Sequence, residues 1–478
     1  MKRWAKGFVI ALVFLFIASL VTFQSANVKA DWSTYRSGIY RTGVGVGSPV
    51  LNTTVLWYSN ISSPADIAGI KGDYDFGLRS CTTPIVSGGV VYISSESEVE
   101  ISEYNHIHWG DVYALNASNG GVIWDYQQSN FVGMVCPTIA NGVLFFGSGD
   151  YDGHGEFAAL NATTGAMIWN NTAIEVYGSA PAVANGTVFL GGGFVYALNA
   201  TNGNIIWKVS PPDRYGSANI VSSPAIANGV VYVGSGNSTY ALNATTGNII
   251  WSYKTDAVIF SDPCYVDGRL FVTSHDGNAY ALNASSGSQI WNFSTTPPIN
   301  TWSNGSNSEP SSPAVSDGLI YFSSNYLPPD QPWNNTFYAL NATNGELIWS
   351  IPRITSLNDW WFWYGNPSAV NEVVYEKGGN GNNYLYALNA TNGSIIWNDN
   401  ETTIDTDPVV DNGILYFGSG GQVYALGTPS FSNLMPTPSN SLTLQNMVFL
   451  AIGILTTALV TLTLIYRRHR KTTKKPKA

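Results

Sequence analysis

One phrase recurs along this chain and constrains its fold more than any other feature. At 195–207 it reads VYALNATNGNIIW, and seven full copies align on a closing tryptophan. A half copy ends at Trp57 near the start, and another, Tyr424-Ala425-Leu426, lies near the end with no tryptophan after it. The closing tryptophans are Trp57, Trp124, Trp169, Trp207, Trp251, Trp291, Trp349 and Trp397. Seven whole copies and two complementary halves make eight units.

A second phrase precedes each copy of the first, as in SPAIANGVVYVGSG at 223–236. Each unit therefore reads as four short strands rich in Val, Ile, Tyr and Trp, separated by Asn/Gly turns. Four strands at a spacing of roughly 40–50 residues are typical of propeller blades. We predict an all-β, eight-bladed β-propeller over 31–427. The strand ending at Trp57 should complete the last blade beside Tyr424, so that both ends of the domain share one sheet.

The repeated pattern A-x-N-A-x-x-G-x-x-x-W resembles the tryptophan-docking motif of the pyrroloquinoline-quinone (PQQ) repeat family. The segment DWSTYRSGIYRTG at 31–43 resembles that family's lead-in. The family includes quinoprotein alcohol dehydrogenases and also cofactor-free propellers, such as an outer-membrane assembly lipoprotein and many surface proteins. The resemblance implies the fold, and the fold alone does not choose among these functions.

The two ends of the chain predict export and membrane anchoring. Residues 1–30 have the basic start, short apolar core and small-residue end of a signal peptide, with an uncleaved anchor as the alternative. A Pro/Ser-rich linker at 428–445 precedes an uncharged apolar stretch at 446–466, which is long enough to span a bilayer. The basic tail at 467–478 predicts a cytoplasmic C-terminus and an extracellular propeller on a single-pass protein.

Charge limits the possible partners. Residues 31–446 hold ten Lys and Arg against all 31 Asp and Glu, a formal charge near −21. A nucleic acid partner is excluded because phosphate binding needs a basic face. Three cysteines do not make a disulfide scaffold. Cys81 and Cys136 precede the first strands of neighbouring blades, which leaves open either a disulfide or two buried thiols.

The phrase itself is interpreted as architectural. Each Trp is expected to pack between blades, and the Asn and Gly are expected to shape the turn. The Asn also begins an Asn-Ala-Ser/Thr acceptor sequon in all seven copies, which predicts glycosylation. The alternative is that turn residues accumulate sequons by chance. The acceptor residues are Asn116, Asn161, Asn199, Asn243, Asn283, Asn341 and Asn389.

Longer connections are expected on one face of the propeller, where they would carry a binding site around the channel mouth. These insertions fall at 58–83, 95–111, 292–312, 326–336 and 350–366. The aromatic stretch Trp360, Trp361, Trp363 and Tyr364 suits stacking on a sugar or another flat ligand, although it also fits a loop held by its own packing. Asp150, Asp152 and Glu156 are weak metal-ligand candidates, and a solvated acidic loop is the alternative.

The enzymatic branch of the family finds little support in these residues. The dehydrogenases typically carry two adjacent cysteines over the cofactor, and this chain has no such pair. If PQQ and Ca²⁺ were bound, Lys71, Arg79 and Arg353 are the candidate cations for the three cofactor carboxylates. We therefore expect a cofactor-free binding module for an extracellular protein or glycan. A divergent PQQ-dependent oxidoreductase and an envelope protein assembly factor are the alternatives.

Overall fold

The computed structural model describes most of the repeat region, all of it within one compact unit, Met1–Thr428. The described residues are 36, 41–45, 47–51, 54–61, 80–102, 105–129, 135–149, 155–174, 176, 178–213, 221–295, 310–326, 334–354, 365–378, 384–399, 402 and 404–427. The expected signal peptide, linker, membrane helix and tail lie outside these residues. Within them, no helix is long and apolar enough to cross a membrane.

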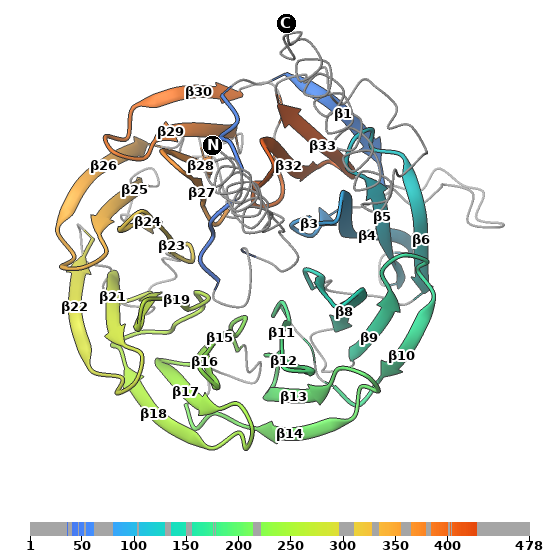
Figure 1. Ribbon diagram of the computed structural model, residues 1–478, viewed down its shortest axis with the longest axis horizontal. Helices are drawn as coiled ribbons and strands as arrows, with labels where there is room; N and C mark the ends of the chain where they lie inside the picture. The colour runs from blue at the N-terminus through green and yellow to red at the C-terminus, as the bar shows by residue number, and fades with distance from the viewer. Residues whose placement is uncertain are drawn as a thin grey trace, which may run out of the picture. The chain divides into compact units, whose positions relative to one another are not determined.

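Eight antiparallel sheets follow one another around a central axis, as Figure 1 shows. Blade 1 contains β3 (Ile85–Ser87), β4 (Val90–Ser102), β5 (Asn105–Asn116) and β6 (Val122–Ser129), with β2 (Ser80–Cys81) beside β4. Blade 2 contains β7 (Thr138–Ala140), β8 (Val143–Gly149), β9 (Gly155–Asn161) and β10 (Met167–Asn171). Blade 3 contains β11 (Ala182–Ala184), β12 (Thr187–Leu190), β13 (Val195–Asn199) and β14 (Ile205–Val209). Blade 4 contains β15 (Ala225–Ala227), β16 (Val230–Ser235), β17 (Ser238–Asn243) and β18 (Ile249–Lys254).

The remaining blades repeat this order, and the last one closes the ring. Blade 5 contains β19 (Cys264–Val266), β20 (Arg269–Thr273), β21 (Asn278–Asn283) and β22 (Gln289–Ser294). Blade 6 contains β23 (Ala314–Ser316), β24 (Leu319–Tyr326), β25 (Asn334–Asn341) and β26 (Leu347–Ile354). Blade 7 contains β27 (Ser368–Val370), β28 (Val373–Gly378), β29 (Tyr384–Asn389) and β30 (Ile395–Asp399). Blade 8 contains β31 (Val409–Asp411), β32 (Ile414–Ser419), β33 (Gln422–Gly427) and, from the start of the chain, β1 (Val55–Asn60).

The predicted closure is confirmed. Strand β1 pairs antiparallel with β33, so that Trp57 lies opposite Ala425 and Tyr58 opposite Tyr424. The first and last strands of the ring are therefore joined by one ladder of backbone hydrogen bonds, which leaves no open blade between the two ends.

Tight turns join the first two strands of each blade because their residues tolerate a left-handed backbone. Asn141 has φ 52° and Gly142 has φ 75°, the conformation of a two-residue hairpin turn with both central residues at positive φ. This turn lies against the turn between the third and fourth strands, since the Ala162 N–H donates to the Gly142 carbonyl at 2.9 Å. We call the side that carries both turns the turn face, and the opposite side the loop face.

One expected loop is instead part of a sheet. The sequence predicts a loop at 95–111, but β4 and β5 continue through most of this insertion, with Ser97 opposite Trp109 and Val99 opposite Ile107. The segment alternates polar and apolar residues, which is the period of a strand rather than of a surface loop. A long hairpin therefore replaces this loop in blade 1.

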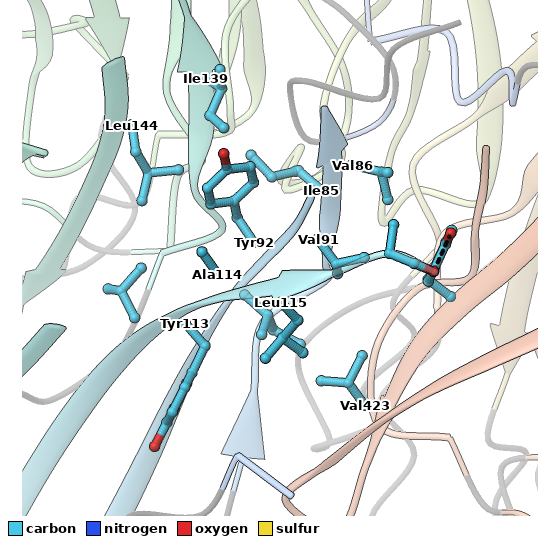
Figure 2. Close-up of a cluster of buried hydrophobic side chains, with 14 of the residues drawn as sticks. Ile85, Val86, Val91, Tyr92, Tyr113, Ala114, Leu115, Ile139, Leu144 and Val423 are labelled. Atoms are coloured by element: carbon cyan, nitrogen blue, oxygen red, sulfur yellow. Dashed lines mark hydrogen bonds between the residues drawn. The ribbon is translucent and has the colours of Figure 1, made fainter. Parts of the chain in front are cut away.

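Apolar side chains pack between neighbouring blades and form the core. Figure 2 shows such a layer, in which Tyr92 and Leu115 of blade 1 meet Ile139 and Leu144 of blade 2 on one side and Val423 of blade 8 on the other. The inner strands of successive blades also contact one another around the axis. Each blade buries both faces in this way, so no single blade has a core of its own.

Candidate functional site: the axis of the ring

The repeated tryptophan makes the same contact at seven of the eight junctions between blades. Its indole N–H donates to the carbonyl of the repeated Ala in the next blade, as Trp207 does to Ala244 at 3.0 Å. The ring lies on the repeated Gly of that blade, where a Cβ on Gly247 would come within 2.9 Å of the indole. The equivalent bonds are Trp57 to Ala117, Trp124 to Ala162, Trp169 to Ala200, Trp251 to Ala284, Trp291 to Ala342 and Trp349 to Ala390. At these junctions the repeated tryptophan therefore joins each blade to the next.

The eighth junction, between blades 7 and 8, is built differently. Blade 8 ends at Gly427 and has no Asn-Ala turn, so Trp397 has no alanine carbonyl to meet. Its indole N–H donates at 2.9 Å to the carbonyl of Val50, which belongs to the segment before β1. The Tyr375 hydroxyl donates to the same carbonyl at 2.9 Å. The N-terminal segment thus supplies the acceptor that the repeat lacks.

That segment reaches Val50 along the axis of the ring. Val44 forms a parallel bridge with Ala369 of β27, and the Val315 N–H of β23 donates to the Thr42 carbonyl at 2.8 Å. Farther along, Asn371 in the turn after β27 donates its Nδ2 to the Gly47 carbonyl at 3.1 Å. The inner strands run from the loop face to the turn face, and residues 41–45 and 47–50 run in the same direction. These residues therefore occupy the axis beside blades 6, 7 and 8.

Arg41 links this segment to the opposite side of the ring. Its side chain is fully buried. The guanidinium donates to the carbonyls of Ala180 at 2.7 Å, Pro181 at 2.9 Å and Pro224 at 3.0 Å. A buried cation is tolerated when carbonyl dipoles replace its lost water, and here blades 3 and 4 supply them. Arg41 therefore fixes the N-terminal segment in the centre.

Arg36 is equally buried but less completely paired. It is 2% exposed and donates one bond, from Nη2 to the Pro313 carbonyl. Its Nε and Nη1 atoms have no hydrogen-bond partner. The charge acts on buried Asp262: burial raises the pKa of that carboxyl, and Arg36 and Arg41 oppose the rise.

In each blade the second phrase contains a proline, such as Pro224 in blade 4. The residues just before these prolines connect blade to blade around the axis. In each link, the backbone N–H of one such residue donates to the side chain of its counterpart in the next blade. The bonds run from Ala180 to Ser223 (3.1 Å), Ser223 to Asp262 (2.7 Å), Asp262 to Ser312 (2.9 Å), Ser312 to Asn366 (2.7 Å), Asn366 to Asp407 (2.7 Å) and Asp407 to Thr83 (3.2 Å). These six hydrogen bonds therefore link neighbouring blades around the axis.

Blade 7 departs from the repeat next to these hydrogen bonds. In blade 4 the Ser222 hydroxyl accepts the N–H of Gly234, twelve residues later, at 2.8 Å. Blade 7 has Gly365 and Lys377 at the two positions, and a Cβ on Gly365 would lie 2.9 Å from the Lys377 Cβ. The absence of a side chain at Gly365 therefore makes room for the buried lysine.

The Lys377 ammonium lies among groups from blade 8. It donates to the Asp405 carbonyl at 3.1 Å and is 5% exposed. Burial lowers the pKa of Lys377, and the carboxylates of Asp407 and Asp405 oppose the fall. The result is a buried, locally compensated charge cluster on the loop-face side of blades 7 and 8.

The three cysteines are free thiols. Burial raises the pKa of Cys81, Cys136 and Cys264 to about 12 in each case. A thiol with so high a pKa stays protonated at neutral pH and is a poor nucleophile. Of the two sequence alternatives for Cys81 and Cys136, the structure contains the unpaired thiols.

Most side chains proposed from the sequence as ligand contacts lie outside the described residues. These are Lys71, Arg79, Asp150, Asp152, Trp360, Trp361, Trp363 and Tyr364. Arg353 belongs to β26, with its backbone opposite Asn335, and its side chain is not described. Glu156 of the proposed acidic metal site accepts a hydrogen bond from Asn170 Nδ2 at 2.8 Å. Among the described residues, no group of three or more His, Cys, Asp or Glu is placed to hold a metal ion.

The sequence patterns did not predict the buried cations at the axis. Arg36 and Arg41 lie in the lead-in segment at 31–43, whose family resemblance assigns no role to its charges. Lys377 is visible once the second phrase is aligned, because EVVYEKGG places Glu-Lys where blade 4 has Val-Gly. A charge at a position that is elsewhere small is the signal that could have found it.

The buried cations show whether the described axis residues could bind PQQ together with Ca²⁺. Three carboxylates need cationic donors that are not already engaged. The Arg41 guanidinium is bound by three carbonyls, and Lys377 is flanked by two carboxylates. Arg36 retains two unpaired nitrogens. The described axis residues therefore do not fit the cofactor with its metal.

Comparison with known proteins places the chain among PQQ-repeat propellers. The family model PQQ_2, described as "Outer membrane protein assembly factor BamB", matches residues 108–215 and 191–428. A tetrathionate hydrolase of Acidianus ambivalens is 31% identical over 137 residues, which is 24% of this chain and 23% of that protein. The match therefore spans about a quarter of the relative's length.

Two solved structures share the fold at low sequence identity. Quinohemoprotein alcohol dehydrogenase from Comamonas testosteroni superposes with a TM-score of 0.64 at 16% identity, covering 88% of this chain and 84% of the other. BamB from Moraxella catarrhalis superposes with a TM-score of 0.52 at 17% identity, covering 74% of this chain and 100% of the other. With the family model matching well over half of its residues, this chain belongs to the PQQ-repeat propeller family whose model is described as outer membrane protein assembly factor BamB.

Proposed function

We propose that this chain is an extracellular propeller, anchored by its C-terminal apolar stretch, that binds a protein or glycan and catalyses no reaction. The observation that carries the proposal is that the chain itself crosses the axis of the ring. Arg41 and the N-terminal segment occupy the centre, and their polar groups are bound to the blades. A centre used for holding the ring together leaves recognition to the loops around it.

The expected location follows from the signals at the two ends of the sequence. A signal peptide at 1–30 would export the chain, and a helix at 446–466 would retain it in the membrane. The basic tail at 467–478 would remain in the cytoplasm. The linker at 428–445 would then separate the propeller from the bilayer.

The ligand is expected on the loop face. The sequence places the aromatic stretch Trp360, Trp361, Trp363 and Tyr364 directly before Gly365. Gly365 itself lies beside Lys377. Aromatic side chains stack on sugar rings and also act as anchors in protein interfaces. The strongly acidic domain favours a neutral glycan or a basic protein surface over a polyanion.

An assembly factor is a second candidate, and the family model favours it. An assembly factor is also a binding protein, so the two proposals differ in the ligand rather than in the chemistry. The quinoprotein alternative requires cations beyond those at the described axis, with Lys71, Arg79 and Arg353 as its candidates.

A binding assay with the full chain tests the proposal. The purified protein would be applied to an array of neutral envelope glycans and to immobilised envelope proteins of its own host. Saturable binding that is lost in a Trp361→Ala/Trp363→Ala variant, with unchanged circular dichroism, is the expected result. Equal binding by this variant and the unmodified chain would remove the aromatic stretch as the ligand contact.

A further inference from the structure

The turn face carries a repeated asparagine whose side-chain oxygen shapes the turn, and in five copies this oxygen also accepts the backbone N–H three places later. In all seven copies the Asn Oδ1 accepts the backbone N–H of the residue two places later. The seven distances lie between 2.8 and 3.0 Å for Asn116, Asn161, Asn199, Asn243, Asn283, Asn341 and Asn389. Every residue except proline has that N–H, so the turn requires the Asn but does not require Ser or Thr at the +2 position.

In the part of the chain that the structure describes, most of the hydroxyl groups at the +2 position form no hydrogen bond that the turn needs. Ser118 and Ser285 donate theirs back to the same Asn Oδ1. The five threonines at this position have no hydroxyl hydrogen bond within the described structure; they are Thr163, Thr201, Thr245, Thr343 and Thr391. Yet all seven turns keep a hydroxyl residue there. Turn geometry leaves this regularity unexplained.

The other side-chain atom of these asparagines is unused. Among the described contacts, none of the seven Nδ2 atoms donates a hydrogen bond. Asn170, which begins an Asn-Asn-Thr sequon in β10, differs because its Nδ2 donates to Glu156 at 2.8 Å. The repeated turns therefore hold the carboxamide in place and leave its nitrogen available.

An exposed aliphatic rim lies beside these turns. Six and seven residues after each Asn come two outer-strand side chains, such as Ile205 and Ile206 after Asn199, and a β-bulge places both opposite one residue of β13. Figure 1 shows these outer strands on the circumference of the ring. Thirteen of the side chains are 40% to 56% exposed: Val122, Ile123, Met167, Ile168, Ile205, Ile206, Ile249, Ile250, Ile290, Leu347, Ile348, Ile395 and Ile396. Apolar groups repeated in this way indicate a cover.

Blade 8 provides an internal contrast. It has Gly427 in place of the repeated Asn, and its aliphatic pair is Val55 and Leu56. Leu56 is half-buried and packs against the core, and a Cβ on Gly427 would lie 3.2 Å from Leu56 Cδ1. Where the acceptor Asn is missing, one of the two aliphatic side chains is covered by the protein itself.

We propose that each of the seven asparagines carries an N-linked oligosaccharide whose first sugars cover the exposed apolar side chains of the outer strand of its own blade, a pair in six blades and Ile290 alone in blade 5. The donor would be a lipid-linked oligosaccharyl diphosphate. The Asn Nδ2 forms a bond to the anomeric carbon and loses one proton, while the bond from that carbon to the diphosphate oxygen breaks and the lipid diphosphate leaves. This inference goes beyond the proposed function and does not depend on it. It makes the turn face a sugar-coated surface.

Site occupancy is the first test. The full chain is isolated from the membranes of its own cells, and glycopeptides are mapped by mass spectrometry. The expected result is sugar on a majority of the seven turn asparagines and none on Asn170. Sugar on only a minority of them, or on none, would overturn the proposal.

Cover of the rim is the second test. Thr201→Ala removes the sequon at Asn199 but keeps the Thr201 backbone N–H that the turn uses, and Thr201→Ser keeps both. Hydroxyl-radical footprinting of the glycosylated protein should show severalfold faster oxidation of Ile205 and Ile206 in the alanine variant only. Val55, on the blade without a turn asparagine, should not change. Equal rates at Ile205 and Ile206 in the two variants would show that the sugar does not cover them.

Discussion

At the turn face, the junctions between blades 3 and 4 and between blades 4 and 5 are made by the same atoms, a Trp N–H and an Ala carbonyl. At the axis the blades differ, because the residues before the prolines include Ala, Ser, Asp, Asn and Thr, and two arginines come from outside the repeat. A repeat can specify the periphery of a ring, where every blade has the same environment. The centre is shared by all blades, and there each blade has its own side chain and its own partner.

The difference between turn face and axis also predicts how substitutions affect stability. A substitution on the turn face should have a similar effect in each blade, altered only by the second donor to the same carbonyl. A substitution at the axis should have an effect particular to its blade.

Replacing Arg41 should cost the most. Arg41→Met leaves three buried carbonyls without their donor, and we expect the free energy of unfolding to fall by about 3 to 5 kcal/mol. Arg36→Met is the matched control: it removes a buried charge that makes one hydrogen bond, so its effect should stay within about 1 kcal/mol. Urea unfolding of the full chain measures both. Equal losses in the two variants would contradict the role given to Arg41.

Acid sensitivity should come from residues of single blades, because the repeated Ala, Leu, Asn, Gly and Trp do not titrate. His275 is buried in blade 5, and burial lowers its pKa from 6.5 to about 4. The unfolded chain binds the proton first as the pH falls, so the part of the stability that depends on His275 should decrease between pH 6.5 and 4 and level off below that.

A shift of this size corresponds to about 3 kcal/mol. His275→Gln should remove that part of the pH dependence. The measurement is the difference in unfolding free energy between the variant and the unmodified chain at pH 7 and pH 4. A difference that does not change with pH would show that His275 does not titrate as its burial implies.

The pair at Gly365 and Lys377 should behave as one unit. Gly365→Ser alone places a side chain against the lysine and should cost about 2 kcal/mol. Adding Lys377→Gly recreates the Ser–Gly pair of blade 4 and should recover most of that loss. Denaturant unfolding of both single variants and the double variant gives the coupling energy. Simple additivity would mean that the two positions do not share space.

The smallest expected effect is a difference in stability between two tryptophan variants on the turn face. Trp207→Phe leaves the Ala244 carbonyl without its indole donor, whereas in Trp251→Phe the Ala284 carbonyl keeps the Tyr232 hydroxyl at 3.1 Å. The first variant should be less stable than the second by about 1 kcal/mol. Thermal unfolding of the two variants measures this difference, and the reverse order would argue against the indole bond as the cause.

The contrast between periphery and axis also explains what the sequence could predict. Eight blades, their four strands and the closure by β1 follow from local patterns that recur, so they were predictable. The path of residues 41–45 and 47–50 was not, because its partners lie hundreds of positions away and share no pattern with it. Arg41 shows the difficulty: three backbone carbonyls recognise it, and carbonyls carry no sequence signal.

The proposed ligand contacts remain predictions for a related reason. Aromatic and acidic residues indicate which chemistry a loop can offer, but not where the loop places them. Glu156 illustrates the point, since it hydrogen-bonds Asn170 within the sheet. Lys377 illustrates the opposite case, because an alignment of the repeats is enough to mark its position as unusual.

We propose that the axis, which Arg41 and the residues after it cross, does not hold a quinone cofactor. The most direct test of this proposal is a titration of PQQ, with Ca²⁺ present, into the purified full-length protein, followed by tryptophan fluorescence and by dye-linked alcohol oxidation. We expect no saturable quenching at micromolar cofactor and no turnover. Tight, saturable quenching accompanied by alcohol oxidation would contradict the proposal and make this propeller a quinoprotein.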